Sequence, residues 1–276
     1  MRKEDIFKIQ INNMDLEKIS KSGQCFRMNA IMGEEGAYSL IAFGKYLEMR
    51  KAKDGYIFTC SEKEWNDLWK EYFDCGTDYE KIYSLVDKED DYMQSAVSFG
   101  KGIRILRQEL FETTISFIIS QQNNIPRIKK CVETICSRFG EEKYNLYEEK
   151  YYAFPTPERL ADASEEELRS CNLGYRSRYI RKSARMIADG EVDLEALIHM
   201  DYENAKKELM KLCGVGIKVA ECICLFALHH VDAFPIDTHI QSVLVNNYPK
   251  GFPFDKYKGY AGILQQYAFY YDIFSG

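Results

Sequence analysis

The chain has 276 residues, of which 46% are hydrophobic and 29% charged, and its formal net charge is -6. This length allows one or two domains, each with its own hydrophobic core. No apolar run approaches the roughly 20 residues of a membrane-spanning helix, which argues against a membrane protein. The negative charge argues against a protein that coats nucleic acid through an overall basic surface, so any DNA contact must use local patches.

The first seven residues, Met1 to Phe7, include two basic residues but have no apolar segment and no small-residue cleavage site. They do not resemble a secretory signal. We therefore expect a cytoplasmic protein, associated with the nucleoid if the source is prokaryotic.

The nine cysteines are odd in number and lie mostly within apolar helical patterns, so they are interpreted as reduced core thiols. Neither they nor the four histidines form a recognised zinc pattern. No cysteine follows Cys224, which excludes a C-terminal iron–sulfur cluster. We expect no metal and no cofactor.

The first hundred residues alternate short extended segments with turns. Extended segments are predicted at 38–43 and 46–49, and Asp54-Gly55 indicates a hairpin. Ser61 and Glu64 predict a capping box at the start of a helix. Apolar residues then recur at helical spacing at Trp65, Leu68, Trp69, Tyr72 and Phe73. We predict an antiparallel β-sheet domain with helices over residues 1–102.

From about residue 103 the apolar period changes to 3.6, which predicts a helical domain over residues 103–276 and an α+β protein overall. Thr156-Pro157 and Ser164 with Glu167 mark helix starts. The predicted helices are 108–121, 125–139, 157–170, 175–190, 202–213, 217–229 and 238–247.

One stretch of this helical region is strongly basic. Between residues 169 and 185 the chain carries six basic residues and no acidic one: Arg169, Arg176, Arg178, Arg181, Lys182 and Arg185. A DNA-binding patch and an ordinary solvated helix face both remain open.

The segment Leu212–Leu228 has the pattern of a helix-hairpin-helix, with glycines at 214 and 216 in the turn. Glycines let backbone amides approach a phosphate, and the following helix N-terminus adds about half a positive charge. Nine residues after Leu228, Asp237 can cap the next helix, which leaves a structural role open.

The residues Gly214-Val-Gly-Ile-Lys218 and Pro235-Ile-Asp-Thr-His239 together resemble the glycosylase branch of the helix-hairpin-helix superfamily, HhH-GPD. A lysine at this place marks the members that also cleave the strand. The resemblance extends to 8-oxoguanine DNA glycosylase/AP lyase of the eukaryotic type through segments 22–27, 105–109, 116–127, 173–178 and 260–269. It implies a TATA-binding-protein-like sheet domain packed on the helical domain.

Carried over position by position, the resemblance implies that Lys218 is the nucleophile and Asp237 the stabilising carboxylate. It assigns the pocket for a flipped base to Gly23, Cys222, Gln265 and Phe269, and phosphate binding to Gly214, Gly216, Val219 and His239. An amide suits a base edge and an aromatic ring suits a base face. The carbonyl of Gly23 would accept the N7 hydrogen that only the oxidised base carries, although a plain turn residue remains the alternative.

For the base opposite the lesion, the resemblance implies Gln122, Asn123, Arg127, Tyr175 and Arg176. Guanidinium groups only donate hydrogen bonds, so they suit N3 and O2 of cytosine better than the amino group of adenine. The sequence departs from the family at Gln122, where asparagine is usual. Contacts of the two arginines with phosphates remain the alternative.

The sequence therefore predicts a base-excision-repair glycosylase that removes 8-oxoguanine opposite cytosine. It would act through a Schiff base on Lys218, with associated AP lyase cleavage. The expected partner is double-stranded DNA that contains 8-oxoguanine, bound by a monomer without a membrane. Two alternatives stay open: a same-fold glycosylase for another damaged purine, and a non-catalytic helix-hairpin-helix DNA-binding protein.

Overall fold

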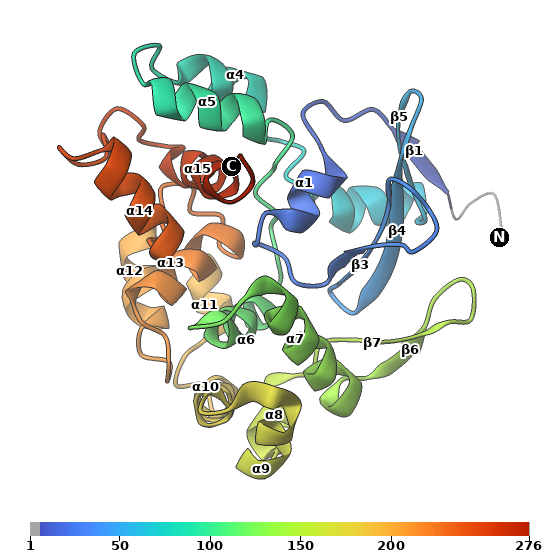
Figure 1. Cartoon of the computed structure of the whole chain (residues 1–276). Coiled ribbons are helices and arrows are strands. Elements are labelled where there is room, and N and C mark those ends of the chain that lie inside the picture. The colour runs from blue at the N-terminus through green and yellow to red at the C-terminus, as the bar shows by residue number, and fades with distance from the viewer. Residues whose placement is uncertain (1–5, 276) are drawn as a thin grey trace.

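The computed structural model describes residues 6–275. Residues 1–5, on which part of the expectation about a signal segment rests, lie outside this range. Five antiparallel strands form one sheet in the order β1-β5-β4-β3-β2, visible beside the helices in Figure 1. Their bounds are β1 (Phe7–Ile9), β2 (Met28–Ala30), β3 (Ala37–Ala42), β4 (Lys45–Ala52) and β5 (Gly55–Phe58).

The two predicted extended segments are confirmed as β3 and β4, except that Phe43 lies in the turn after β3. The Asp54-Gly55 hairpin is also confirmed, because Ala52 pairs with Gly55 across a two-residue turn. Alternating residues of β4, such as Leu47 and Met49, point into the core of the sheet domain.

One face of the sheet is covered by a helical segment rich in aromatic residues. It begins with α2 (Glu62–Glu64), continues through a π-helical turn (Trp65–Trp69) and ends with α3 (Lys70–Tyr72). Only half of the expected capping box forms: Ser61 accepts from the Glu64 amide, but the Glu64 carboxylate accepts from the Trp69 indole. The buried indole needs an acceptor, and the wider turn brings it to Glu64.

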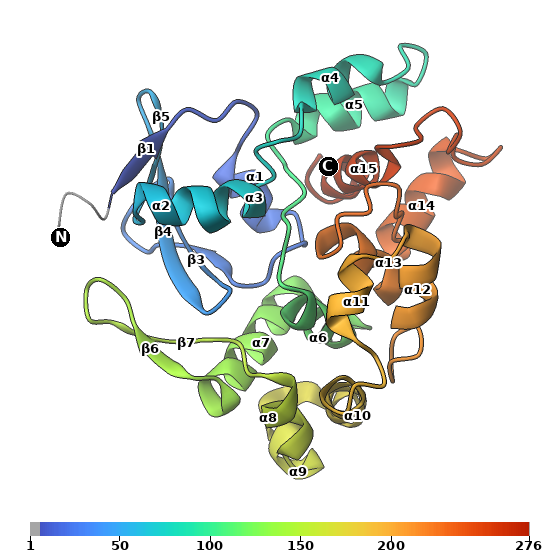
Figure 2. The ribbon, with the colours of Figure 1, turned by 180° about the vertical axis from the view of Figure 1, so that it is seen from behind.

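Three early helices lie outside that segment: α1 (Leu16–Lys21), α4 (Tyr79–Leu85) and α5 (Asp91–Gly100). α5 packs against α15 (Ala261–Phe274), and Figures 1 and 2 show α4 and α5 over α15, away from the sheet. The hydrophobic core of the helical body accordingly includes Tyr79, Met93 and Val97. A domain boundary at residue 102 stays a prediction.

The helical body contains most of the remaining elements. Its helices are α6 (Leu110–Ser120), α7 (Ile125–Phe139), α8 (Pro157–Asp162), α9 (Glu165–Leu168), α10 (Arg176–Ala188), α11 (Leu194–Ile198), α12 (Tyr202–Leu209), α13 (Ile217–Phe226) and α14 (Thr238–Asn247). A small hairpin, β6 (Glu142–Tyr144) and β7 (Lys150–Tyr152), extends from α7. In residues 6–275 no helix is both long enough and apolar enough to cross a bilayer.

The predicted helix 157–170 is wrong as a single element. Ala163 is extended, and Ser164 begins α9 with a complete capping box to Glu167. A helix start inside the predicted span therefore divides it, because the Ser164 side chain satisfies the first amides of a new helix. The other six predicted helices are found, with ends shifted by up to a turn.

The loop between α1 and β2 is fixed to the chain that links the two parts. Buried Gln24 donates to the Arg104 carbonyl and accepts from the Leu106 amide, while the Gln108 amide group donates to the Gln24 carbonyl. These contacts are made by groups shielded from water, so each is costly to break. They fix the backbone of Gly23 beside the helical body.

Candidate active site

One pocket brings together residues from four separate parts of the chain. It collects all six residues that the sequence placed in the catalytic or base-binding set: Gly23, Lys218, Cys222, Asp237, Gln265 and Phe269. The α1–β2 loop, α13, the start of α14 and α15 supply them. Five residues without a role in the sequence prediction complete the lining: Ser22, Phe117, Phe226, Pro235 and Gln266.

The amine of Lys218 lies over α6. Its Nζ is 3.4 Å from the Ser120 hydroxyl oxygen and 5.4 Å from the centroid of the Phe117 ring. Ser120 donates its own hydrogen to the Phe117 carbonyl at 2.8 Å, so its lone pairs face the amine. Phe117 in turn stacks on Phe226 of α13. These contacts hold the amine in one place by packing and a hydrogen bond.

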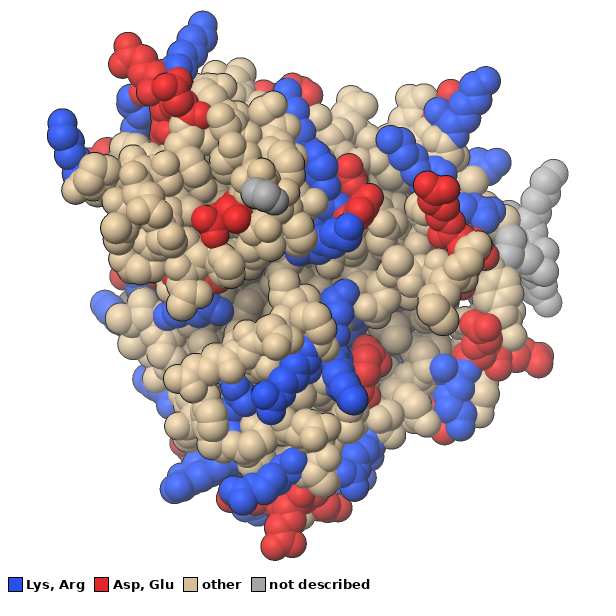
Figure 3. Space-filling model, in the orientation of Figure 1, with Lys and Arg blue, Asp and Glu red and all other residues tan. Residues whose placement is uncertain are grey.

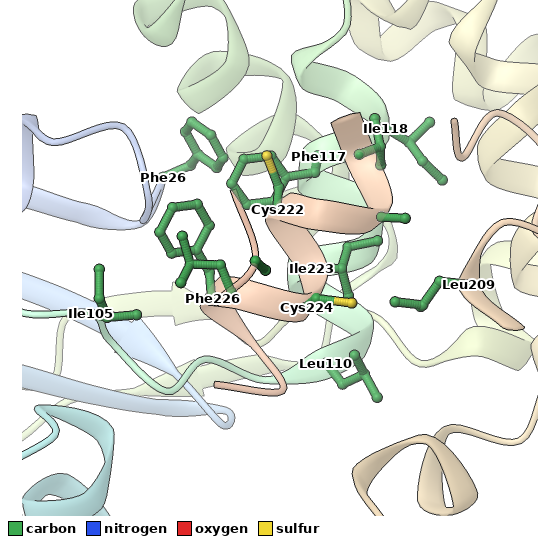
Figure 4. Close-up of a cluster of buried hydrophobic side chains, with 14 of the residues drawn as sticks. Phe26, Ile105, Leu110, Phe117, Ile118, Leu209, Cys222, Ile223, Cys224 and Phe226 are labelled. Carbon is green, nitrogen blue, oxygen red and sulfur yellow. The ribbon is translucent and has the colours of Figure 1, made fainter. Parts of the chain in front are cut away.

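Cys222 lies one helical turn after Lys218 on α13 and is buried beside Phe117, as Figure 4 shows. Burial raises the pKa of its thiol to about 11, although the neighbouring Lys218 amine opposes the shift. The thiol therefore stays protonated at neutral pH and offers the pocket a soft apolar surface. Cys224 of the same helix points away from Cys222, toward Leu209. All nine cysteines are free, and seven are buried.

Asp237 is the N-cap of α14. Its Oδ1 accepts a hydrogen bond from the Ile240 amide at 2.9 Å. The structural role that the sequence left open is therefore real, and the same carboxylate also lines the pocket. The cap fixes the carboxylate on the side of the pocket where α14 begins.

Two adjacent glutamines of α15 are held by backbone carbonyls on opposite sides of the pocket. Gln265 donates to the Pro235 carbonyl at 2.9 Å, and Gln266 donates to the Ser22 carbonyl at 2.7 Å. Both side chains are almost fully buried. The amide of Gln265 is thereby given a fixed orientation, as a group that recognises a base edge requires.

Gly23 lies against the ring of Phe269. Its φ of +76° is a left-handed conformation that favours glycine. A Cβ at this position would lie only 3.1 Å from Cε1 of Phe269. The backbone therefore favours glycine, and a side chain here would press on the ring, which supports more than a plain turn role.

The expected phosphate-binding residues lie at the α12–α13 hairpin and at the start of α14. Gly214 has φ +85° and lies so close to Tyr179 of α10 that a Cβ would collide with the ring. Gly216 caps α13 without any side-chain hydrogen bond, which leaves the first amides of the helix to a ligand. The Val219 side chain is buried in the core, so only its backbone could serve. His239 contacts the Asp272 carboxylate through Nδ1 at 2.8 Å.

Of the residues expected to face the opposite base, Gln122, Tyr175 and Arg176 contact one another at the turn between α6 and α7. Gln122 has a left-handed φ of +47°, and its side-chain oxygen lies 3.5 Å from the hydroxyl of Tyr175, which is 47% exposed. Arg127 is exposed on the first turn of α7. Asn123 folds back to donate to the Ile119 carbonyl, and Arg176 is only 5% exposed.

The basic run between residues 169 and 185 divides into ion-paired side chains, exposed unpaired side chains and the buried Arg176, which donates to backbone carbonyls. Arg169 pairs with Glu165, and Arg185 pairs with Asp162 and Asp189. The exposed side chains of Arg178, Arg181 and Lys182 make no ion pair within residues 6–275. Figure 3 shows Lys and Arg gathered over the part of this face where α7 and α10 lie. A protein of net charge -6 thus keeps uncompensated positive charge near the hairpin.

Two family models match the chain side by side. Residues 6–114 match "8-oxoguanine DNA glycosylase, N-terminal domain", and residues 115–248 match "HhH-GPD superfamily base excision DNA repair protein". An N-glycosylase/DNA lyase of Saccharomyces cerevisiae is 39% identical over 161 residues, which are 54% of this chain. The match spans only 42% of the yeast protein's length.

Solved structures match over nearly the whole chain. MBOgg1 in complex with a low-affinity DNA ligand is 34% identical, with a TM-score of 0.92 over 99% of this chain and 97% of that one. The 8-oxoguanine glycosylase/lyase of Clostridium acetobutylicum, bound to DNA with cytosine opposite 8-oxoguanine, is 35% identical. Its TM-score is 0.89 over 96% of both chains. The chain belongs to the 8-oxoguanine DNA glycosylase family within the HhH-GPD superfamily.

Proposed function

We propose that this protein is a DNA glycosylase/AP lyase that removes 8-oxoguanine from double-stranded DNA. The observation that carries the proposal is the pocket that holds an amine and a carboxylate, Lys218 and Asp237, together with groups suited to a purine. A non-catalytic DNA-binding protein needs the hairpin glycines but has no use for that pair. We further propose a monomer that works in the cytoplasm, associated with the nucleoid if the source is prokaryotic.

We assign recognition of the base to side chains that contact its two faces and its edge. The Phe269 ring and the neutral Cys222 thiol offer surfaces for the faces of a flipped purine, and Gln265 offers an amide for its edge. Moving the base out of the duplex costs a few kcal/mol of stacking and pairing energy, and these contacts must offset that cost. A Gly23 carbonyl that accepts the N7 hydrogen would separate the oxidised base from guanine, whose N7 carries only a lone pair.

In the chemical step, the Nζ lone pair of Lys218 attacks C1′ of the deoxyribose. A C1′–N bond forms while the bond from C1′ to the base breaks, and the base leaves with the electron pair and then takes up a proton. The Asp237 carboxylate stabilises the positive charge that develops on the sugar. Opening of the sugar ring gives a Schiff base, from which loss of a C2′ proton expels the 3′ phosphate and breaks the strand.

The specificity of the pocket can be tested with duplexes that contain 8-oxoguanine, guanine or 3-methyladenine opposite cytosine. We expect release of 8-oxoguanine only, measured by mass spectrometry of the freed base. Gln265→Ala and Phe269→Ala should each weaken binding of the 8-oxoguanine duplex by about tenfold, since a lost base contact costs about 1–3 kcal/mol. Binding of undamaged duplex should change by less than about twofold. Release of 3-methyladenine in preference to 8-oxoguanine would instead favour the alkylated-purine alternative.

Gly23→Ala should block the pocket through the Phe269 ring. Its Cβ would meet Cε1 of Phe269 at 3.1 Å and Cδ1 of Ile125 at 3.5 Å, in a backbone with φ +76°. Overpacking of this kind costs about 1–3 kcal/mol, so we expect lesion binding to weaken about tenfold or more.

Gly33→Ala is the matched control for this change. Gly33 has a similar φ of +84°, but nothing lies within 4 Å of the Cβ position. Backbone strain should cost both variants about 1 kcal/mol of stability, and Gly23→Ala should also lose the overpacking cost of about 1–3 kcal/mol. Normal lesion binding by Gly23→Ala would show that the ring does not form a wall of the base site.

A further inference from the structure

The carboxylate of Glu221 on α13 is buried and has no part in the chemical step. Glu221 follows Lys218 by three residues in the same helix but lies outside the pocket lining. Only 6% of the residue is exposed. A charged group at this depth is costly unless its partners offset the loss of water. The partners of Glu221 therefore indicate what the residue holds in place.

Two of these partners come from α12. The Tyr202 hydroxyl lies 2.6 Å from both carboxylate oxygens of Glu221, and the Lys206 amine lies 3.2 Å from Oε1. Burial, together with the hydrogen bond to Glu221, raises the pKa of Tyr202, so the hydroxyl keeps the proton that it donates. The carboxylate is thereby fixed between α12 and α13, which pack on each other as Figure 2 shows.

The third partner lies on the chain that leads to Asp237. Oε2 of Glu221 accepts a hydrogen bond from the Phe234 amide at 2.9 Å, three residues before Asp237. This hydrogen bond is buried, so its loss would leave the amide with neither water nor an acceptor. The contact ties the backbone at Phe234 to the helix that carries Lys218.

Contacts with α15 hold the same segment from another side. Gln265 donates to the Pro235 carbonyl at 2.9 Å, and the Gly262 amide donates to the Val231 carbonyl at 2.7 Å. Asp237 caps α14 two residues after Pro235, and α14 itself packs on α15. The segment before Asp237 is therefore placed relative to α15 by several contacts and relative to α13 through Glu221.

We propose that Glu221 is a positioning residue for Asp237. Through the Phe234 amide it sets where the Asp237 carboxylate lies relative to the Lys218 amine, which α13 carries. The hydrogen bond from the Ile240 amide orients the carboxylate within α14 but does not tie it to α13. The inference rests on the proposed function, because it assumes that Asp237 acts on the sugar.

Glu221→Met removes the acceptor and keeps a side chain of similar length. Release of 8-oxoguanine at saturating enzyme should slow by about 10–100-fold, since a misplacement of about 1 Å can cost that much. The borohydride-trapped adduct at a preformed abasic site should form as in the wild type. There the Lys218 amine condenses with the sugar aldehyde, with loss of water, and no base departs. Equal loss of both activities would overturn the proposal and leave Glu221 a structural role only.

Glu221→Gln is the conservative comparison, because its side-chain oxygen can still accept from the Phe234 amide. It should keep base release within about threefold of the wild-type rate. A rate as low as that of Glu221→Met would overturn the proposal, since the charge would then matter and the bond to Phe234 would not. Should Glu221→Met fail to fold, Glu221→Asp carries the test. It keeps the charge, but it is one methylene shorter and should slow base release while preserving the adduct.

Glu203→Gln is the matched control. Glu203 is an exposed residue of α12 that pairs with the same Lys206 at 3.4 Å, so its loss disturbs the neighbouring charge alone. Both activities should be preserved. Base release slowed as in Glu221→Met would assign the effect to the charge of Lys206 and contradict the proposal.

A double-mutant cycle tests whether Glu221 acts through Asp237. Added to Asp237→Asn, the change Glu221→Met should slow base release no further, because the carboxylate that Glu221 positions is already gone. A multiplied loss would overturn the proposal and assign Glu221 an effect of its own.

The contact with the segment can also be measured without DNA. Amide hydrogen exchange at Phe234 should be about tenfold faster in Glu221→Met than in the wild type, because the amide loses a buried acceptor. Unchanged exchange would overturn the proposal. A wild-type protein that released no base would contradict the proposed function alone, since the exchange still reports whether Glu221 holds the segment that carries Asp237.

Discussion

Lys218→Gln is expected to abolish both base release and the covalent adduct that borohydride traps. An amide nitrogen has no available lone pair, so it can neither attack C1′ nor form an imine. Glutamine can still donate to the Ser120 hydroxyl and pack on Phe117, the two contacts that hold the lysine. Binding of lesion DNA should therefore stay within about threefold of wild type.

Lys211→Gln is the control for the trapping experiment. Lys211 is an exposed lysine close to the same hairpin and pairs with Glu208. The Lys211→Gln variant should form the borohydride-trapped adduct as efficiently as the wild-type protein. Undiminished trapping by Lys218→Gln would move the nucleophile to another amine and remove the main support for the proposed mechanism.

Part of the pocket could be predicted from the sequence because the glycines, the lysine and the capping aspartate lie close together in the chain and form a recognisable motif. Gly214, Gly216 and Lys218 lie within the helix-hairpin-helix, and Asp237 caps the helix that follows it. Placing Gly23, Gln265 and Phe269 beside them required the family resemblance, since nothing local in a sequence brings residue 23 to residue 269.

Other parts of the site could not be read from the sequence. Phe117 and Ser120 lie in an apolar helix, where their pattern is that of any core residue, and only the packing of α13 on α6 places them at the amine. Both residues do lie within the segment 116–127 that carried the resemblance, which was the one available signal. The inward direction of Arg176 was equally hidden, because a basic run looks the same whether a member faces water or carbonyl groups.

Asp237→Asn should lower the rate of base release by about 10²–10³-fold at saturating enzyme, the usual effect of removing one electrostatic contact to a transition state. The measurement is single-turnover release of 8-oxoguanine, with thermal unfolding measured in parallel. Asparagine keeps an oxygen that can accept from the Ile240 amide, and it is as good an N-cap as aspartate. The melting temperature should therefore change little while the rate collapses.

Two further variants separate charge from capping. Asp201 caps α12 in the same manner, accepting from the Asn204 amide, but it lies outside the pocket, so Asp201→Asn should preserve the rate. Asp237→Ala removes charge and cap together and should add a stability loss of about 1 kcal/mol to the same loss of rate. If Asp237→Asn loses stability in proportion to rate, the cap explains the defect. If it keeps both, the carboxylate has no part in catalysis, and the positive charge on the sugar must be stabilised by another group.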